Sequence, residues 1–237
     1  MKKLIILSLI LVGAITSCSN RVVSGNKSLK TETDSLSNAI GLMMGQQLRS
    51  MDGIEVDNQK VYNAIQKVLT ASDSELDSLD KYDISAARDF FRNYMTVILP
   101  QKRLEAGQKF LEEIAKKDGV KKTESGMYYE ILNAGDQAVK AISEQDTVVV
   151  NYVGTTIEGK EFDSSIKRGE PATFPLNRVI KGWTEGVQLV GKGGKIKLYI
   201  PSELAYGQRG QLGSQTLIFD IDVLDVKPAI EAAPEKK

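Results

Sequence analysis

Residues 148–165 read VVVNYVGTTIEGKEFDSS and decide the fold of the second half of the chain. Up to residue 153 the side chains alternate between two faces, with Val148, Val150 and Tyr152 on one of them, which is typical of a half-buried strand. A Glu-Gly pair then signals a turn, and the returning segment carries Phe162 and Asp163. We therefore expect a hairpin that brings two aromatic rings and one carboxylate together. Ordinary core packing explains both rings equally well on this stretch alone, so the rest of the chain must decide.

Composition excludes several classes of function. The 237 residues suffice for one large domain or two small ones. The 31 basic and 31 acidic residues cancel, so no global field favours nucleic acid or an anionic surface. The sequence contains no histidine, which excludes Ser-His and Cys-His nucleophile pairs, imidazole bases and histidine-containing metal sites. We expect neither a metal nor a cofactor.

The amino-terminal segment is predicted to be removed on export. Residues 1–17 hold two lysines and an apolar run that is too short to span a bilayer, the layout of a secretory signal. Residues 15–18, ITSC, resemble a lipoprotein box, which implies lipidation of Cys18 and cleavage before it. The alternative is an ordinary signal in which Cys18 is incidental. Acyl chains at this residue would anchor the chain to a membrane, and the polar residues 18–33 would form a flexible tether.

Helical periodicity begins near Asp34. Apolar residues at three- and four-residue steps predict one helix up to Met51 and a second that begins at Asp57 or Asn58. Residues 72–80 are acidic and are expected to form a loop or a short helical turn. A third helix is predicted from Ser85, as the N-cap, to residue 118, with Pro100 as the point where it kinks or breaks.

These helices carry more apolar residues than their own packing can bury. The segment 34–118 offers a thin core, and small cores are often completed by association. We therefore expect a homodimer formed through this segment, with Phe91, Tyr94 and Ile98 on the exposed stripe. A closed three-helix bundle is the alternative.

Beyond Gly119 the apolar period shortens to two. Strands are predicted at 127–132, 146–153, 195–200 and 216–226, and a short helix at 183–189. On the last strand one face is apolar and the other carries three aspartates, which suits an antiparallel sheet covered on one side. The expected class is α+β: a helical region, then an antiparallel half-barrel sheet wrapped on one short helix. Residues 228–237 are expected to be disordered.

Residues 119–227 resemble the FKBP-type peptidyl-prolyl isomerases. Each motif is weak alone, but their order and spacing together are specific. The matching motifs are Gly119-Val120, Ser125-Gly126, Asn151-Tyr152-Val153-Gly154, Phe162-Asp163-Ser164-Ser165, Arg168-Gly169, Phe174, Val179-Ile180-Lys181-Gly182-Trp183, Glu185-Gly186, Ile200-Pro201, Leu204-Ala205-Tyr206-Gly207 and Thr216-Leu217-Ile218-Phe219. The helical segment is also similar to the amino-terminal dimerisation region of the macrophage infectivity potentiator and periplasmic FKBP subfamily.

The resemblance implies a pocket for a proline ring. Trp183 would form its floor, and Asp163, Tyr206 and the backbone N–H of Ile180 would form its polar rim. The walls would be Tyr152, Phe162, Val179, Ile180 and Phe219. Phe174 is expected to be a core residue only. The implied partners are unfolded or proline-containing polypeptides, and the implied location is the bacterial cell envelope, with the lipid in the outer membrane and the protein facing the periplasm.

The reaction implied is rotation about an X–Pro amide, which needs no nucleophile. Asp163 would orient the site and Tyr206 would bind a substrate carbonyl. One departure from the family is the polar segment 208–215, QRGQLGSQ, which is shorter than the usual loop over the pocket and lacks its Ile-Pro-Pro run. The rival function is a holdase chaperone whose helices bind unfolded chains, with a vestigial pocket.

Overall fold

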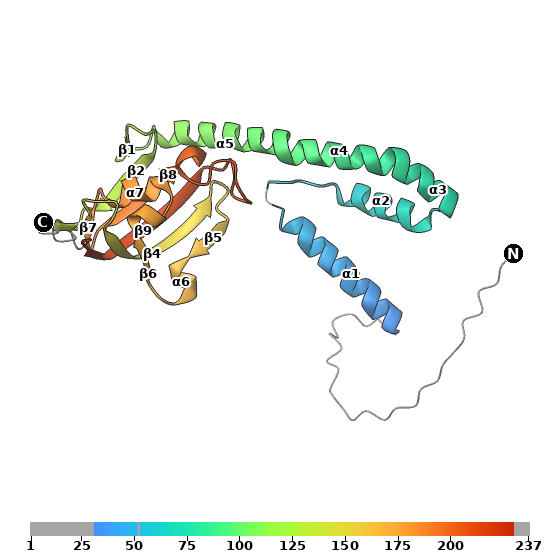
Figure 1. The fold of residues 1–237 in the computed structure, drawn as a ribbon, viewed down its shortest axis with the longest axis horizontal. Coiled ribbons are helices and arrows are strands. Elements are labelled where there is room, and N and C mark those ends of the chain that lie inside the picture. The colour runs from blue at the N-terminus through green and yellow to red at the C-terminus, as the bar shows by residue number, and fades with distance from the viewer. Residues whose placement is uncertain (1–30, 52, 230–237) are drawn as a thin grey trace, which may run out of the picture. The chain divides into compact units, whose positions relative to one another are not determined.

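The computed structural model describes residues 31–51 and 53–229 (Figure 1). The predicted signal segment, Cys18 and most of the predicted tether lie outside these residues, as do residues 230–237 of the predicted tail. The chain divides into two compact units, Met1–Met51 and Asp52–Lys237. Each unit is described by itself.

The first unit contains one helix, α1 (Glu32–Arg49), among its described residues. Thr31 is the N-cap, and its side chain and that of Asp34 exchange hydrogen bonds with each other's backbone N–H groups at 3.0 Å. This capping box fixes the start of the helix inside the segment predicted as tether. No residue of α1 is buried, and large apolar side chains such as Met43 are 70% exposed.

The second unit begins with α2 (Asn58–Thr70), which Asp57 caps as predicted by accepting hydrogen bonds from two backbone N–H groups. After it, residues 73–80 are helical, so of the two alternatives expected for residues 72–80 the short helical turn is confirmed and the loop is wrong. Helical structure runs without a break from residue 73 to residue 114 (Figure 1). Its parts are α3 (Asp73–Ser78), the π-helical turns η1 (Leu79–Ile84) and η2 (Tyr94–Ile98), α4 (Ser85–Asn93) and α5 (Leu99–Ile114).

Two helix boundaries predicted within this helical run, a start at Ser85 and a break at Pro100, are wrong. Ser85 has helical backbone angles and is no N-cap, because the helix begins one segment earlier at Ser72, where Glu75 completes a capping box. Pro100 neither breaks nor splits the helix. It falls in the first turn of α5, directly after the π-helical turn η2, and wider turns of this kind accommodate a missing backbone donor. At the other end α5 stops at Ile114, before the predicted residue 118.

The remaining elements form the predicted α+β module. Within the described residues a seven-stranded antiparallel sheet has the order β1-β2-β8-β9-β4-β5, and β6 pairs with β4 beside β5 (Figure 1). A separate two-stranded sheet joins β3 and β7. The strands are β1 (Val120–Lys122), β2 (Tyr128–Asn133), β3 (Asp136–Lys140), β4 (Thr147–Thr156), β5 (Glu161–Ser164), β6 (Ala172–Pro175), β7 (Gly191–Lys192), β8 (Lys195–Ile200) and β9 (Leu217–Lys227). The helical pieces are α6 (Ser165–Arg168), η3 (Leu176–Arg178), α7 (Lys181–Val187) and η4 (Ser202–Leu204).

Glycines allow α7 to lie close against the sheet. A Cβ atom at Gly182 would come within 2.5 Å of Ile200, and one at Gly186 within 2.6 Å of Leu198. Both distances are below van der Waals contact, so the spacing of the two glycines sets how closely helix and sheet approach. The main core therefore forms between α7 and the apolar face of β4, β8 and β9.

The opposite face of the sheet is partly covered as well, which the sequence did not predict. The last turns of α5 place Leu111 and Ile114 against Tyr199, which is 4% exposed. The ring of Phe110 lies 6.1 Å from that of Tyr199. The carboxylates on the outer face of β9 are paired with lysines. Lys197, Lys195 and Lys192 contact Asp220, Asp222 and Asp225 at 2.8 to 3.0 Å.

No helix within residues 31–51 and 53–229 combines the length and the hydropathy that crossing a membrane requires.

Candidate functional site

An open cavity of about 500 Å³ lies where β4, β5 and β9 face α7. It is lined mainly by aromatic and aliphatic side chains, with a few polar groups among them. The lining residues are Tyr152, Asp163, Phe174, Arg178, Val179, Ile180, Lys181, Trp183, Ala205, Tyr206 and Phe219. Eight of these eleven side chains are aromatic or aliphatic, but polar atoms contribute at least as much of the exposed lining as apolar atoms do. Such a site suits a small apolar ring with polar backbone on either side of it.

Trp183 is the base of this cavity. Three rings stand nearly perpendicular to its indole, at interplanar angles of 88° to 89°: Tyr152 at 5.0 Å, Phe219 at 5.3 Å and Phe174 at 5.8 Å between centroids. Edge-to-face contacts of this kind hold each ring in one orientation. The indole N–H is buried and has no hydrogen-bond acceptor among the described residues. An unsatisfied buried donor of this kind is rare in ordinary cores.

The structure brings most of the predicted site residues together. Seven of them line the cavity: Tyr152, Asp163, Val179, Ile180, Trp183, Tyr206 and Phe219. Phe162 does not line it, but packs behind Phe219 with ring centroids 5.5 Å apart at 88°. Phe174, expected to be a core residue only, is part of the wall. Arg178, Lys181 and Ala205 were missed as lining residues, although each is adjacent in sequence to a predicted one.

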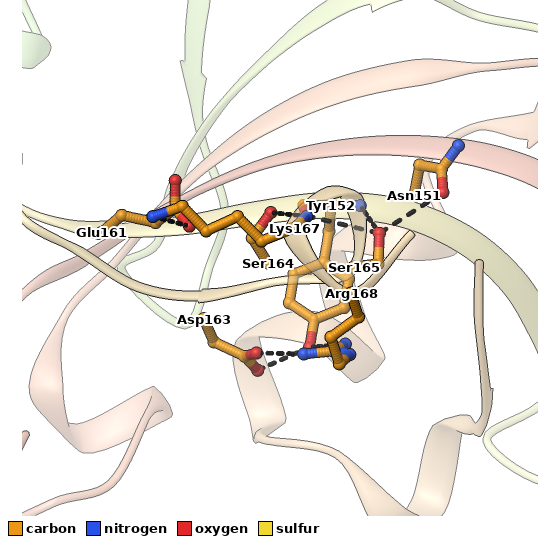
Figure 2. Close-up of polar contacts among 8 residues, drawn as sticks. All are labelled: Asn151, Tyr152, Glu161, Asp163, Ser164, Ser165, Lys167 and Arg168. Atoms are coloured by element: carbon orange, nitrogen blue, oxygen red, sulfur yellow. Dashed lines mark hydrogen bonds and ion pairs between the residues drawn. The ribbon is translucent and has the colours of Figure 1, made fainter. Parts of the chain in front are cut away.

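Asp163 is held by two donors. The hydroxyl of Tyr152 donates to Asp163 Oδ2 at 2.5 Å, and Arg168 Nη1 donates to Oδ1 at 2.5 Å (Figure 2). Arg168 Nη2 also donates to the Tyr152 hydroxyl at 2.9 Å, which closes the triangle. Burial pushes the pKa of Asp163 upward, but the hydrogen bonds from Tyr152 and Arg168 outweigh it, and the net pKa is lowered. The group is therefore a fixed carboxylate and is poorly suited to act as a proton base.

The residues after Asp163 explain why the Phe-Asp-Ser-Ser motif has its order. Ser164 is the N-cap of α6 and accepts a hydrogen bond from the N–H of Lys167 at 3.2 Å. That short helix carries Arg168 back to Asp163. Ser165 is buried, and its hydroxyl accepts the backbone N–H of Tyr152 at 2.9 Å (Figure 2). Consecutive residues therefore supply the carboxylate, the turn that returns its partner, and the support for the facing strand.

Gly154 makes room for two of the rings. A Cβ atom at this position would lie 2.8 Å from both Phe162 Cζ and Phe219 Cε1. Real Cβ atoms do not approach neighbours so closely, so any larger residue would displace one ring or the other. The glycine of the Asn-Tyr-Val-Gly motif is therefore required by the packing of the wall.

Besides the indole N–H of Trp183, two further hydrogen-bond donors at the cavity have no partner within the described part of the chain. The backbone N–H of Ile180 lies before α7 and takes part in none of the hydrogen bonds of this segment. The hydroxyl of Tyr206 is likewise without a bond to a described residue. Burial, with a smaller contribution from the charge of Asp163, raises the pKa of Tyr206, so this hydroxyl remains a donor. Both groups are available to carbonyl oxygens of a bound chain.

The segment 208–215, which departs from the family pattern, is held by hydrogen bonds from Arg103, a residue that does not line the cavity. Arg103 on α5 donates from Nη1 to the carbonyl oxygens of Gln211 at 3.1 Å and Gly213 at 3.0 Å. Within the segment, the N–H of Ser214 bonds the carbonyl of Gly207 at 2.6 Å. The turn that carries Tyr206 is thereby connected to the long helix.

The sheet wrapped on one helix and the aromatic cavity between them are typical of an FKBP-like module, and sequence comparison leads to the same class. The protein-family model described as "FKBP-type peptidyl-prolyl cis-trans isomerase" matches residues 139–224. A second family model, described as "Domain amino terminal to FKBP-type peptidyl-prolyl isomerase", matches residues 33–131.

Individual relatives agree with the family models. "FKBP-type peptidyl-prolyl cis-trans isomerase FkpA" of Escherichia coli K12 is 52% identical over 134 residues, which are 54% of this chain and 49% of that protein. The match thus spans about half the length of this curated relative. A "Probable FKBP-type peptidyl-prolyl cis-trans isomerase" of Haemophilus influenzae is 38% identical over 81% of this chain and 85% of its own length. The crystal structure of FkpA from E. coli superposes with a TM-score of 0.60 at 36% identity, and covers 86% of this chain and 100% of that one. The chain belongs to the FKBP-type peptidyl-prolyl cis-trans isomerase family.

Proposed function

We propose that the protein is a peptidyl-prolyl cis-trans isomerase that acts on unfolded or proline-containing polypeptides. The observation that carries the proposal is the cavity in which three rings stand perpendicular to Trp183. A proline ring is compact, apolar and small enough for such a site. The reaction is rotation about the X–Pro bond, against a barrier of about 18–20 kcal/mol that arises from amide resonance. No covalent bond forms or breaks, and the site needs no nucleophile.

The chemistry requires only that the cavity favour the twisted amide over both planar forms. The twisted carbonyl is less dipolar than the planar amide. Exchanging water for the aromatic faces of the cavity therefore costs the twisted form less free energy than it costs the planar forms. A thousandfold acceleration corresponds to about 4 kcal/mol, which desolvation and one or two hydrogen bonds are able to supply. Ile180 N–H and the Tyr206 hydroxyl are the proposed donors to substrate carbonyls. Asp163 is proposed to orient the site, and the aromatic and aliphatic walls, with Phe162 behind them, to bind the ring.

Proline-limited refolding of a model protein tests the assignment. Asp163→Ala, Phe219→Ala and Tyr206→Phe are expected to lower the isomerisation rate. Tyr82→Phe is the matched control for the tyrosine, since Tyr82 is 62% exposed on η1 and lies outside the cavity. If all three variants accelerate refolding as fast as the parent, the proposed site is wrong.

We assign the isomerase domain to residues 119–227. The packing of α5 on the sheet suggests a refinement of the test, because a piece that starts at residue 119 loses Leu111 and Ile114 and uncovers Tyr199. We expect residues 99–229 to show full activity on short peptides, and residues 119–227 to retain activity with lower stability. The holdase alternative predicts the reverse: no isomerase activity in either piece, and suppression of aggregation by residues 28–118 alone.

A homodimer through residues 34–118 is supported by exposed apolar side chains. Of the predicted stripe, Phe91 is 50% exposed, whereas Tyr94 and Ile98 are half-buried, so the stripe is wrong at those two positions. The exposed neighbours are Phe90 at 65% and Val97 at 54%, along α4 and η2. Monomeric proteins seldom leave a row of large apolar side chains in water. Sedimentation of the chain without residues 1–17 tests this. A monomer at micromolar concentration would contradict the dimer, and Phe90→Glu combined with Phe91→Glu is expected to dissociate it.

The proposed location is the bacterial cell envelope, with a lipid anchor at Cys18 in the outer membrane and the protein facing the periplasm. Support for it comes from the sequence of residues 1–18 alone. Labelling of the full chain in cells with an acyl donor, compared with Cys18→Ser, tests the anchor. Equal labelling of both proteins would contradict it.

A further inference from the structure

Positive charges outnumber negative ones at the cavity: Arg168, Arg178 and Lys181 lie at or near it, against the one carboxylate of Asp163. Arg178 at the end of η3 and Lys181 at the start of α7 both line it. Asp163 is the only acidic residue of the lining. Its charge is already matched by Arg168 through a 2.5 Å ion pair. The remaining positive charge at the cavity is therefore that of Arg178 and Lys181.

These two cations are available to a ligand. Neither Arg178 nor Lys181 forms an ion pair with any residue of the described part of the chain. By contrast, Lys192, Lys195 and Lys197 on β7 and β8 are each paired with an aspartate of β9. Both side chains are exposed to water and are therefore accessible to an incoming peptide.

Their position places them beside the residues that flank the proline. Arg178 and Lys181 bracket Val179 and Ile180 in the sequence, and all four line the same cavity. On the proposed function, the N–H of Ile180 donates a hydrogen bond to a substrate carbonyl while the ring lies against Trp183. The substrate residues directly before and after the proline then lie near Arg178 and Lys181.

We propose that Arg178 and Lys181 are specificity-determining residues that select prolines with an acidic residue directly before or after them. This inference rests on the proposed isomerase function and adds the substrate class to it. Attraction between opposite charges at a surface site is modest and is screened by salt. The preference is therefore one of rate and affinity at low ionic strength, superimposed on the binding of the ring.

Two peptide series test the proposal with the full-length protein. In one, Glu, Gln or Lys precedes the proline, and in the other it follows. At low ionic strength we expect kcat/KM for the Glu peptide to exceed that for Gln about fivefold in at least one series, with Lys below Gln, as unit charges at surface distances imply. The difference should collapse in about 1 M salt, where the Debye length is ~3 Å.

Variants assign the effect to the two residues. In Arg178→Gln combined with Lys181→Gln the Glu-to-Gln ratio is expected to fall to about one, and Arg178→Glu combined with Lys181→Glu should favour the Lys peptide. The ratio within each protein cancels any loss of overall activity. Lys121→Gln combined with Lys122→Gln, which removes the same two charges from β1 at the other edge of the sheet from β5, should leave the ratio as it is in the parent.

The opposite outcomes are distinct. Equal rates for Glu, Gln and Lys peptides in both series at low salt, or a preference that survives in the double Gln variant, would overturn the proposal. If the variants fail to fold, the salt titration of the unmodified protein decides. If no peptide is isomerised at all, the proposed function fails, and fluorescence of Trp183, the single tryptophan of the chain, still measures whether Glu peptides bind more tightly.

Discussion

The hydroxyl of Ser165 accepts the backbone N–H of Tyr152 at 2.9 Å, across the one place where β4 lacks a neighbouring strand on that edge (Figure 2). There β6 pairs with residues 147–150 and β5 with residues 153–155. The interval between them would leave the N–H of Tyr152 unpaired if Ser165 did not fill it. The Ser165 hydroxyl thus takes the place of a strand partner at Tyr152, whose side chain lines the cavity.

Ser165→Ala is expected to destabilise the protein and to weaken the site. The substitution leaves a buried backbone donor without an acceptor, which costs about 1–3 kcal/mol of unfolding free energy. Urea denaturation measures this cost, and kcat/KM on a neutral peptide should fall as Tyr152 loses its support. Ser74→Ala on exposed α3 is the control and should change stability by less than about 0.5 kcal/mol. Equal stability of the two variants would show that Ser165 supports nothing.

Activity should be independent of pH across the neutral range. The hydrogen bonds from Tyr152 and Arg168 outweigh burial and hold the pKa of Asp163 below its ordinary value. A carboxylate with a depressed folded pKa stays charged above its ordinary pKa, and its contribution disappears only as the pH falls through the lower, folded value. Burial raises the pKa values of Tyr152 and Tyr206. We therefore expect constant kcat/KM between about pH 5 and pH 9.

Arg168→Gln tests the cause of that profile. Loss of the guanidinium leaves burial opposed by Tyr152 alone, so the pKa of Asp163 should rise and the acid limb of the activity profile should move to higher pH. Lys167→Gln is the matched control, since it removes one charge from the same helix but breaks only the ion pair between the exposed Lys167 and the half-buried Glu161. A bell-shaped profile centred near neutral pH in the parent would contradict the assignment, because it would require a group that titrates there.

Gly154→Ala should damage the cavity more than its size suggests. The added methyl would lie 2.8 Å from both Phe162 and Phe219, and overpacking of this kind costs about 1–3 kcal/mol. Displacement of Phe219 should also lower peptide affinity, measured by fluorescence of Trp183. Gly41→Ala is the control, because nothing lies within 4 Å of that position in α1. There the change should leave peptide binding unaltered, and binding lost equally in both variants would contradict the explanation.

The sequence was most informative where local pattern and tertiary contact coincide. Alternating apolar residues located β4, β8 and β9, and the motif residues Tyr152, Asp163 and Trp183 do line one cavity. It failed where the structure is decided by distant partners. The burial of Tyr199 depends on α5, which is far away in sequence, and the strand pattern alone leaves that face open to water. Phe162 was expected to line the cavity and Phe174 to lie in the core, but the structure has them the other way round. Whether a ring faces the cavity or the core depends on tertiary packing, which periodicity does not reveal.

The helical region shows the same limit in another form. Ser85 with Ile84 before it has the pattern of a helix start, yet Ser72 and Glu75 form the real one upstream. Capping signals are local and several can occur in one helix, so the sequence does not tell which is used. Pro100 is typical of a helix break because it lacks a backbone N–H donor. Here it follows a π-helical turn, and the helix continues through it.

Arg103→Ala should loosen the loop beside the cavity. Two of the hydrogen bonds of Arg103 go to the carbonyl oxygens of Gln211 and Gly213, and hydrogen bonds from a charged donor are worth about 1.5–3 kcal/mol each in favourable cases. Amide hydrogen exchange of residues 207–214 is therefore expected to accelerate, while that of β4 stays as in the parent. Because Tyr206 begins the same turn, kcat/KM should fall through a higher KM. Arg103→Lys should restore only part of the protection, since one ammonium reproduces a guanidinium fork poorly. Lys109→Ala, elsewhere on α5, serves as the control. If the loop exchanges at the parental rate in Arg103→Ala, the long helix does not restrain it, and the site is independent of the helical region.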